Sequence, residues 1–335
     1  MNEDLQLLRK GLWPLSMVYG IAITLRNYLF HAGIRKVHRV GVPVVSVGNI
    51  AAGGTGKTPL VAWLVERAIG AGKRPGVLAR GYGRARGEEL NDEGKLLARR
   101  FPGLAQVQDP DRVRGARRLI AENGVDVIIV DDGFQHRRLH RDWDLVCLDT
   151  VRPFAGGLLP VGYLREYPKA LRRADALILT RAGGIAIEAV EERREKLAAC
   201  AGADVPAFAS DHVPVRLREM PSGAEIPLEA LRDKRVVLLS GIARPESFVE
   251  TVEGLGAEVV HHVRRRDHHL HTSEELSEME GLVDRLDATL VTTEKDDVKL
   301  VDCSASRLVL ELDLRFLGEE PEPSTFLSFR ETKHP

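Results

Sequence analysis

The chain of 335 residues carries 48 Lys and Arg against 49 Asp and Glu, which gives a formal net charge of -1. Hydrophobic residues make up 44% and charged residues 29%, proportions that exclude intrinsic disorder as the main state. A net charge near zero excludes a uniformly basic nucleic-acid binder but permits a local basic patch. The three cysteines are Cys147, Cys200 and Cys303; they are far apart and form no C-x-x-C. This spacing excludes a disulfide framework and a thiolate zinc site, and it fits a reducing compartment.

The first feature along the chain is an almost uncharged run over residues 12–25, closed by Arg26. It is shorter than the roughly 20 apolar residues that a membrane-spanning helix needs, and no small-residue cleavage site follows it as in a signal peptide. Basic residues surround the run, and Trp13 and Tyr28 flank it, which is typical of a helix lying in a membrane interface. A core helix packed on the first domain explains the run equally well. We expect residues 1–40 to form this N-terminal segment.

A glycine-rich loop from Gly48 to Thr58, GNIAAGGTGKT, follows a β-branched strand and precedes a helix expected over residues 58–71. This order is the context of a phosphate-binding P-loop. Backbone N–H groups of such a loop surround phosphate oxygens, Lys57 supplies a charge for the β- and γ-phosphates, and Thr58 offers a hydroxyl to Mg²⁺. Ala51 replaces the first glycine of the strict pattern, but the flanking strand and helix disfavour a chance turn. The predicted nucleotide-binding residues here are Gly53, Gly54, Thr55, Gly56, Lys57 and Thr58.

Strands and helices alternate through the rest of the chain, which predicts an α/β fold: a P-loop NTPase-type parallel sheet with helices on both faces, plus a second, smaller α/β domain. The P-loop domain is expected over residues 41–205, with a mobile loop at 81–94 and helices at 96–100 and 112–123. The smaller domain is expected over 206–315 and closes over a cleft; its last strand, 307–314, can join either sheet. The tail, 316–335, is Pro-rich, and we expect it to be poorly ordered from residue 318.

An acid pair, Asp131 and Asp132, ends the apolar strand that begins at Val127. In P-loop enzymes a carboxylate at this place helps to hold Mg²⁺. An acid after four apolar residues is a weak signal alone and a stronger one when a P-loop lies upstream. We therefore predict Thr58 and Asp131 as magnesium ligands.

Seven motifs lie between Val44 and Leu300. In chain order they are GNIAAGGTGKTP, RGYGR, DDGFQHRRLHRD, GGLLPVGYLRE, RRADALILT, RRRDHH and TTEKDDVKL. Together they resemble the tetraacyldisaccharide 4'-kinase family, the lipid A 4'-kinases of Gram-negative bacteria. The resemblance implies transfer of the ATP γ-phosphate, with Mg²⁺, to the 4'-hydroxyl of a tetraacylated glucosamine disaccharide 1-phosphate, giving lipid IVA. It also implies peripheral or monotopic contact with the cytoplasmic face of the inner membrane and no nucleic-acid partner. The oligomeric state stays open.

The resemblance assigns roles to further residues. Asp92 and His268 match an Asp-His pair that activates the sugar hydroxyl, and Asp131 and Asp132 match the magnesium and network acids. Because we expect Asp92 in the first domain and His268 in the second, the pair would meet only across the interdomain cleft. The match at Asp92 rests on a short segment, since the loop from Arg84 to Asp92 lacks the longer insertion of other members. The residues expected near the nucleotide also include Arg165 and Glu166.

Two other P-loop functions and one metal site compete with this assignment. A membrane-bound ATPase switch of the partitioning type would carry a Lys at Ala52, and a GTPase would have Asn-Lys-x-Asp where Thr180 and Arg181 stand. A zinc site is disfavoured because no H-E-x-x-H and no nearby cysteine accompany the histidines at 261, 262, 268, 269 and 271.

Overall fold

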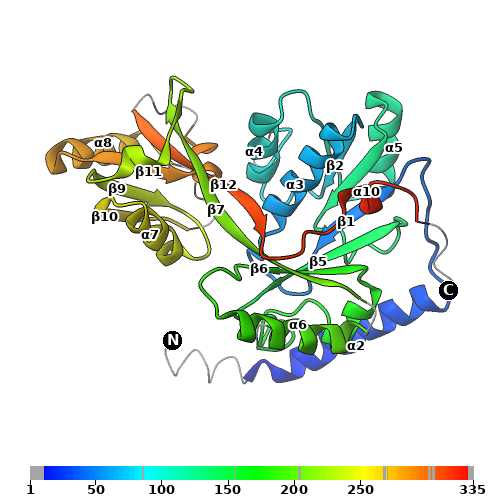
Figure 1. The fold of residues 1–335 in the computed structure, drawn as a ribbon. Helices are drawn as coiled ribbons and strands as arrows, with labels where there is room; N and C mark the ends of the chain where they lie inside the picture. Colours follow the sequence, from blue (N-terminus) through cyan, green and yellow to red (C-terminus); the bar gives the residue numbers. More distant parts are fainter. Residues whose placement is uncertain are drawn as a thin grey trace. The chain divides into compact units, whose positions relative to one another are not determined.

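The computed structural model describes residues 11–84, 87–154, 156–202, 205–266, 269, 271–300, 303 and 306–330. The chain forms two compact units, each built from alternating strands and helices (Figure 1). Unit 1 comprises Met1–Gly81, Gly103–His212 and Leu314–Pro335, and unit 2 comprises Tyr82–Pro102 and Val213–Asp313. The division differs from the predicted one mainly in residues 82–102, which we expected in the P-loop domain and which belong to unit 2.

Unit 1 contains a parallel sheet in the order β6-β5-β1-β4-β2-β3, and the first residues of β7 pair with β6. Val47 of β1 lies beside Asp131 of β4. The carboxyl ends of these strands therefore meet at one edge of the sheet, where ligands bind in open α/β folds. The strands are β1 (Val44–Gly48), β2 (Pro75–Ala79), β3 (Ala105–Gln108), β4 (Val127–Asp131), β5 (Trp143–Asp149), β6 (Ala176–Thr180) and β7 (Ala207–Met220).

Helices cover both faces of this sheet, as predicted. Ile128 and Val130 pack in one apolar cluster with Leu119 of α5. Because side chains alternate along a strand, the equally buried Val127 and Ile129 face the opposite side, and α3 contacts β4. The helical elements of unit 1 are α2 (Trp13–His31), α3 (Lys57–Gly70), α5 (Arg112–Asn123), η1 (Pro168–Arg173), α6 (Ile187–Ala201) and α10 (Pro323–Phe326).

The predicted bounds of the helix at 112–123 are confirmed, and local chemistry explains both ends. The Asp111 side chain accepts hydrogen bonds from the backbone N–H groups of Val113 and Arg114. Gly124 ends the helix in the left-handed conformation, at φ 59, where a glycine meets no steric penalty.

Unit 2 contains the parallel order β10-β9-β11-β12, and β8 pairs antiparallel with β7. Val236 and Leu238 of β9 pack with α7, whereas the alternating Val237 and Leu239 pack with α8, so both faces are covered. The last strand pairs with β11, which resolves the alternative that its sequence left open. The elements are α4 (Asp92–Arg100), β8 (Glu225–Ile226), η2 (Leu228–Leu231), β9 (Arg235–Ser240), α7 (Pro245–Gly254), β10 (Glu258–Arg264), α8 (Ser273–Leu286), β11 (Thr289–Thr293), α9 (Glu294–Asp297) and β12 (Arg307–Phe316).

Helix α4 joins unit 2 through ion pairs with α9. Arg99 binds Asp297, and Glu93 lies 3.4 Å from Lys295 Nζ. The helix begins at Asp92, earlier than the predicted residue 96, because Asn91 caps it by accepting a hydrogen bond from Gly94 N. The predicted mobile loop therefore includes the first turn of a helix.

The expectation of a poorly ordered tail is wrong for residues 318–330. Phe326 is buried and its ring is nearly perpendicular to that of Trp143, at 5.5 Å between centroids. Lys73 Nζ donates a hydrogen bond of 2.7 Å to the carbonyl of Leu327, and Arg330 pairs with Asp175. The Pro-rich composition of the tail did not predict these few apolar and charged contacts, which hold the segment on unit 1.

Helix α2 is two-sided. Its inner face is hydrogen-bonded to unit 1, since Ser16 Oγ donates to Leu158 O at 3.0 Å and Tyr19 donates to Arg165 O at 2.9 Å. Within the part of the chain that the structure describes, no helix is both long and apolar enough to cross a bilayer. The outer face exposes large apolar residues: Trp13, Leu15, Met17, Val18, Ile21, Leu25 and Tyr28.

Candidate functional site

The glycine-rich loop runs from the end of β1 to the first turn of α3. Asn49 Nδ2 donates to Thr55 Oγ1 at 2.8 Å inside the loop. Gly56 caps α3 in the left-handed conformation, at φ 79, and a Cβ there would lie 3.0 Å from the ring of His212. Both facts require glycine at this position. Lys57 and Thr58 follow as the first residues of α3, so the helix N-terminus opens onto the loop, which is the geometry that binds phosphate.

The acid pair lies at the same edge of the sheet. Asp132 Oδ1 is 3.5 Å from Lys57 Nζ, and its Oδ2 accepts a hydrogen bond of 2.7 Å from Arg165. Burial works to raise the pKa of Asp132, but Lys57 and Arg165 outweigh it and hold this pKa below its usual value. Asp132 is therefore ionised at neutral pH, and its carboxylate contacts two cationic side chains beside the loop, those of Lys57 and Arg165.

The oxygen donors at this edge fit Mg²⁺. Asp131 ends β4 next to Val47, and Thr58 lies in the first turn of α3, which contacts β4. Asp132 Oδ1 is buried and accepts no hydrogen bond from the described residues. Carboxylate and hydroxyl oxygens are the hard ligands that Mg²⁺ prefers. Thr58 and Asp131, the residues predicted as magnesium ligands, both lie at this edge of the sheet, and their role at the metal stays a prediction.

Thr180 at the end of β6 and Arg181 after it hold carbonyl groups of the loop, a role that was not predicted for either residue. Thr180 Oγ1 donates to Thr55 O at 3.0 Å, and Arg181 donates to Gly54 O at 2.7 Å. A second bond of 2.7 Å joins Arg181 to Asp149. Because these contacts tie two carbonyl groups of the loop to side chains at the end of β6 and just after it, they help to fix the shape of the loop.

Two histidines beside the site are partly buried and uncharged at neutral pH. Burial, with a smaller effect of Arg181, lowers the pKa of His212 to about 4. Burial, followed by Arg112 and Arg80, lowers the pKa of His136 to about 4. The ring of His212 packs against Gly56, so the loop has a neutral neighbour at pH 7.

We expect the free energy of unfolding to fall as the pH drops from about 6.5 to about 4. The folded pKa of each histidine lies below its unfolded value, so the unfolded chain binds the proton first, and each costs up to about 3 kcal/mol. Urea denaturation of His212→Gln across this range should show a shallower pH dependence than the parent protein. His31→Gln, at the exposed end of α2, is the control and should keep the full dependence. Equal slopes for His212→Gln and the parent would contradict this.

Arg165 and Glu166, both predicted near the nucleotide, point to different partners. Arg165 reaches Asp132 at the loop. Glu166 is fully buried and accepts hydrogen bonds from Asn27 of α2 at 2.7 Å and from Arg173 at 3.1 Å. The structure therefore places Arg165 beside Asp132 and Glu166 beside Asn27 of α2.

Asp92 lies in the first turn of α4 and is buried within unit 2. His268 lies outside the described residues. We expected these residues in different domains, but Asp92 belongs to unit 2, the unit that includes Val213–Asp313. The argument that the pair can meet only across an interdomain cleft therefore does not hold.

Comparison with known proteins identifies the family. A sequence profile described as tetraacyldisaccharide-1-P 4'-kinase, LpxK, matches residues 8–330. The chain belongs to the tetraacyldisaccharide 4'-kinase family. The relative from Anaeromyxobacter dehalogenans (strain 2CP-C) is 43% identical over 297 residues, covering 83% of this chain and 78% of that protein. The relative from Syntrophus aciditrophicus is 39% identical over 309 residues, covering 85% and 82%.

A solved member of the tetraacyldisaccharide 4'-kinase family has the same fold. The crystal structure of the "apo" form of LpxK from Aquifex aeolicus in complex with ATP matches with a TM-score of 0.74 and 30% identity, covering 93% of this chain and 96% of that one. Family membership confirms the resemblance found in the motifs. It also means that the partitioning-type ATPase is not favoured.

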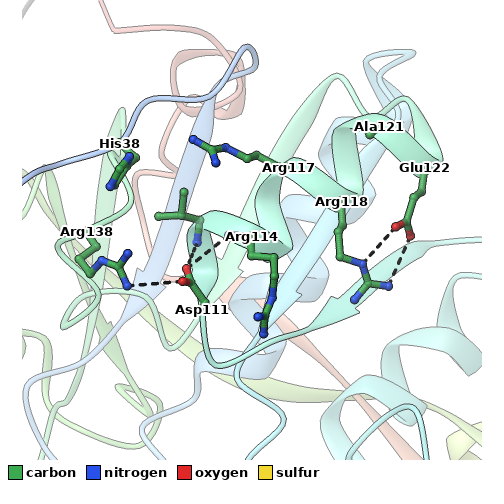
Figure 2. A pocket seen from close by; sticks show the side chains of 9 residues that line it. His38, Asp111, Arg114, Arg117, Arg118, Ala121, Glu122 and Arg138 are labelled. Carbon is green, nitrogen blue, oxygen red and sulfur yellow. Dashed lines mark hydrogen bonds and ion pairs between the residues drawn. The ribbon is translucent and has the colours of Figure 1, made fainter.

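Other polar groupings are weaker sites for a kinase of this family. Figure 2 shows a pocket of about 480 Å³ on α5, lined by four arginines. Most of this charge is neutralised, because Arg114 pairs with Asp109, Arg118 with Glu122 and Arg138 with Asp111. A cluster of His269, His271 and Glu275 has ligand atoms within 4.8 Å of one another, but Glu275 is engaged by His269 and by the N–H of Thr272 in the cap of α8.

Proposed function

We propose that this protein is an ATP-dependent kinase that transfers the γ-phosphate to the 4'-hydroxyl of tetraacyldisaccharide 1-phosphate, forming lipid IVA in lipid A biosynthesis. The observation that carries the proposal is the cluster of Lys57, Asp132 and Arg165 beside the glycine-rich loop. The chain that contains this cluster belongs to the tetraacyldisaccharide 4'-kinase family. ATP and Mg²⁺ are the implied cofactors.

The loop residues Gly53 to Thr58 bind and orient the triphosphate through N–H groups and the N-terminus of α3. Lys57 places its charge on the β- and γ-phosphates, and Arg165 adds a second cation at the same edge. Asp132 holds both side chains in position before the nucleotide arrives, so little reorganisation is needed in the transition state. Thr58 and Asp131 would hold Mg²⁺, which when bound neutralises charge that develops on the phosphates.

Asp92 is the proposed base for the acceptor. Phosphoryl transfer passes through a loose transition state, so positioning of the hydroxyl and removal of its proton are what the protein supplies. In this proposal Asp92 accepts the proton of the 4'-hydroxyl, and His268 tunes the basicity of that carboxylate.

Membrane contact is the second part of the proposal. The apolar outer face of α2 would lie on the cytoplasmic face of the inner membrane, where the lipid substrate resides. Val18 and Ile21 are 64% and 65% exposed and belong to a group of exposed apolar side chains on α2, and such a patch is typical of a surface that meets an apolar partner. Basic residues near the helix, including Arg35 and Arg39, suit an anionic lipid surface.

Val18→Glu combined with Ile21→Glu should lower co-sedimentation with anionic vesicles at least about tenfold. Each apolar side chain buried in the interface contributes about 1.5–3 kcal/mol, and both residues point away from unit 1, so the melting temperature should stay unchanged. Ile187→Glu, at a 75% exposed position on α6, is the matched control and should bind vesicles normally. Unchanged binding of the α2 variant would remove the membrane assignment.

The direct test of the kinase is incubation of the full chain with γ-labelled ATP, Mg²⁺ and the disaccharide 1-phosphate. Label should appear in a lipid-soluble product and should depend on the acceptor. ATP turnover that is independent of the lipid would instead favour the ATPase switch.

A further inference from the structure

Two histidines and one carboxylate meet at the start of α8, within unit 2. His269 Nε2 lies 2.9 Å and 3.1 Å from the two carboxylate oxygens of Glu275. The ring of His271 lies against that of His269, with 5.0 Å between centroids and an interplanar angle of 85°. One ligand atom from each of the three residues lies within 4.8 Å of the others. In the described part of the chain, no other group of three such side chains is arranged to hold a metal ion.

The cap of α8 places the carboxylate independently of the histidines. Thr272 Oγ1 accepts a hydrogen bond of 3.2 Å from the N–H of Glu275, and the N–H of Thr272 donates to Glu275 Oε2 at 3.0 Å. This reciprocal pair is a capping box, which turns the glutamate side chain back toward the residues before the helix. Glu275 is therefore already held where His269 and His271 approach it.

The carboxylate can serve a cation as well as the cap. An ionised carboxylate offers about four lone pairs on two oxygens, and the N–H of Thr272 takes one of them. A cation would replace the contact with His269, because a ring nitrogen and a carboxylate oxygen are both metal ligands. Two ligand atoms of a tetrahedral zinc ion are about 3.3 Å apart, close to the present separations of 2.9 and 3.1 Å. Only a small shift would therefore admit the ion.

The donor set selects the class of cation. Imidazole nitrogen suits zinc and its neighbours among the transition metals, whereas Mg²⁺ prefers oxygen ligands alone. All three residues are partly buried, so a water molecule can supply a fourth ligand. The sequence disfavoured zinc because it lacks H-E-x-x-H and a nearby cysteine. The spacing found here, His-x-His-x-x-x-Glu, contains neither, and its third ligand is brought in by the helix cap.

One positive charge opposes a cation at this place. Arg265 lies 3.5 Å from Glu275 Oε1, and the two side chains are 31% and 25% exposed. A partly exposed ion pair of this kind is weak, so it competes with a divalent ion held by two imidazoles without excluding it.

We propose that His269, His271 and Glu275 form a binding site for a divalent cation of the zinc class, separate from the proposed magnesium site at the glycine-rich loop. The ion joins the residues before α8 to the first turn of that helix. His268 directly precedes His269 in the chain. Under the proposed kinase function, and only under it, the ion would also restrain the backbone next to the residue proposed to tune Asp92.

The test titrates Zn²⁺ into the full chain against a chromogenic chelator, without nucleotide and in excess Mg²⁺ so that sites made of oxygen alone are filled. The parent protein should bind one Zn²⁺ with a dissociation constant on the order of micromolar, weaker than structural sites with four protein ligands. Glu275→Gln should weaken binding at least about tenfold. Because glutamine also completes a capping box, the melting temperature of this variant without zinc should stay close to that of the parent.

Two further variants separate the site from other histidines and from loss of fold. His261→Gln removes an exposed histidine of β10 outside the cluster and is the matched control, which should bind Zn²⁺ as the parent does. Arg265→Gln removes the competing cation and should tighten binding about two- to fivefold, the range for a partly exposed ion pair. A variant that merely disturbed the fold would weaken binding instead.

The proposal is overturned by a parent protein that binds no Zn²⁺ in excess Mg²⁺. It is also overturned if Glu275→Gln and His271→Gln both bind Zn²⁺ as tightly as the parent, because the ion would then lie on other side chains. Thermal unfolding supplies a second readout, since saturating Zn²⁺ should raise the melting temperature of the parent and of His261→Gln but not that of Glu275→Gln. None of these measurements depends on phosphoryl transfer, so failure of the kinase assay would leave their outcome unchanged.

Discussion

Lys57→Ala should lower kcat by at least about 10³-fold while the fold survives. The lysine supplies the charge that neutralises the β- and γ-phosphates, and such preorganised electrostatic contacts contribute several kcal/mol in the transition state. Loss of the lysine leaves Asp132 bonded to Arg165 at 2.7 Å, so this carboxylate keeps one cation. Label transfer from γ-labelled ATP measures the effect, and the melting temperature should move by only a few degrees.

The control for this experiment is Lys196→Ala, which removes an exposed lysine of α6 that pairs only with Glu192 among the described residues. Its activity should equal that of the parent protein. Near-normal turnover of Lys57→Ala would refute the assignment of the loop at 53–58 to the triphosphate.

Asp92→Asn should lower kcat by about 10²–10⁴-fold, with little change in the dissociation constant of ATP. This is the range for a positioned general base, and asparagine keeps the shape of a buried residue at the start of α4. His268→Ala should have a similar effect. Because the two residues are proposed to act as a unit, the double variant should lose much less than the product of the two single losses.

Glu93→Gln provides the matched control, since Glu93 is the next residue of the same helical turn and pairs with Lys295 rather than taking part in the chemistry. It should keep kcat. Wild-type kcat in Asp92→Asn, or fully multiplicative losses in the double variant, would exclude the dyad. Asp131 or Asp132 would then be the better candidate for the base.

The fold and the position of the glycine-rich loop could be predicted because their signals are local. The apolar strand ending in Asp131 and the cap at Asp111 are short sequence patterns with a direct structural reason. The acid pair after β4 was expected beside the glycine-rich loop because P-loop enzymes carry such an acid, and Asp132 Oδ1 lies 3.5 Å from Lys57 Nζ.

What could not be predicted depends on contacts between distant residues. Helix α4 is polar and short, and the ion pairs that place it in unit 2 join it to Lys295 and Asp297. Thr180 and Arg181 support the loop by donating to backbone carbonyls, a role that any hydroxyl or guanidinium could take and that leaves no motif. The contact of His212 with Gly56 likewise appears only in three dimensions.

The hydrogen bonds that hold α2 on unit 1 affect how the enzyme would bind its lipid substrate at the membrane. Ser16, Tyr19 and Asn27 bond the helix directly to the segment that contains Leu158, Arg165 and Glu166. In the proposed membrane-bound state, the helix is therefore not a flexible tether, and adsorption fixes the tilt and rotation of the phosphate loop relative to the bilayer. The orientational entropy of catalysis would then be lost once, on adsorption, rather than at every turnover. Substrates that diffuse in the plane of the membrane would all approach the loop at the same height and angle.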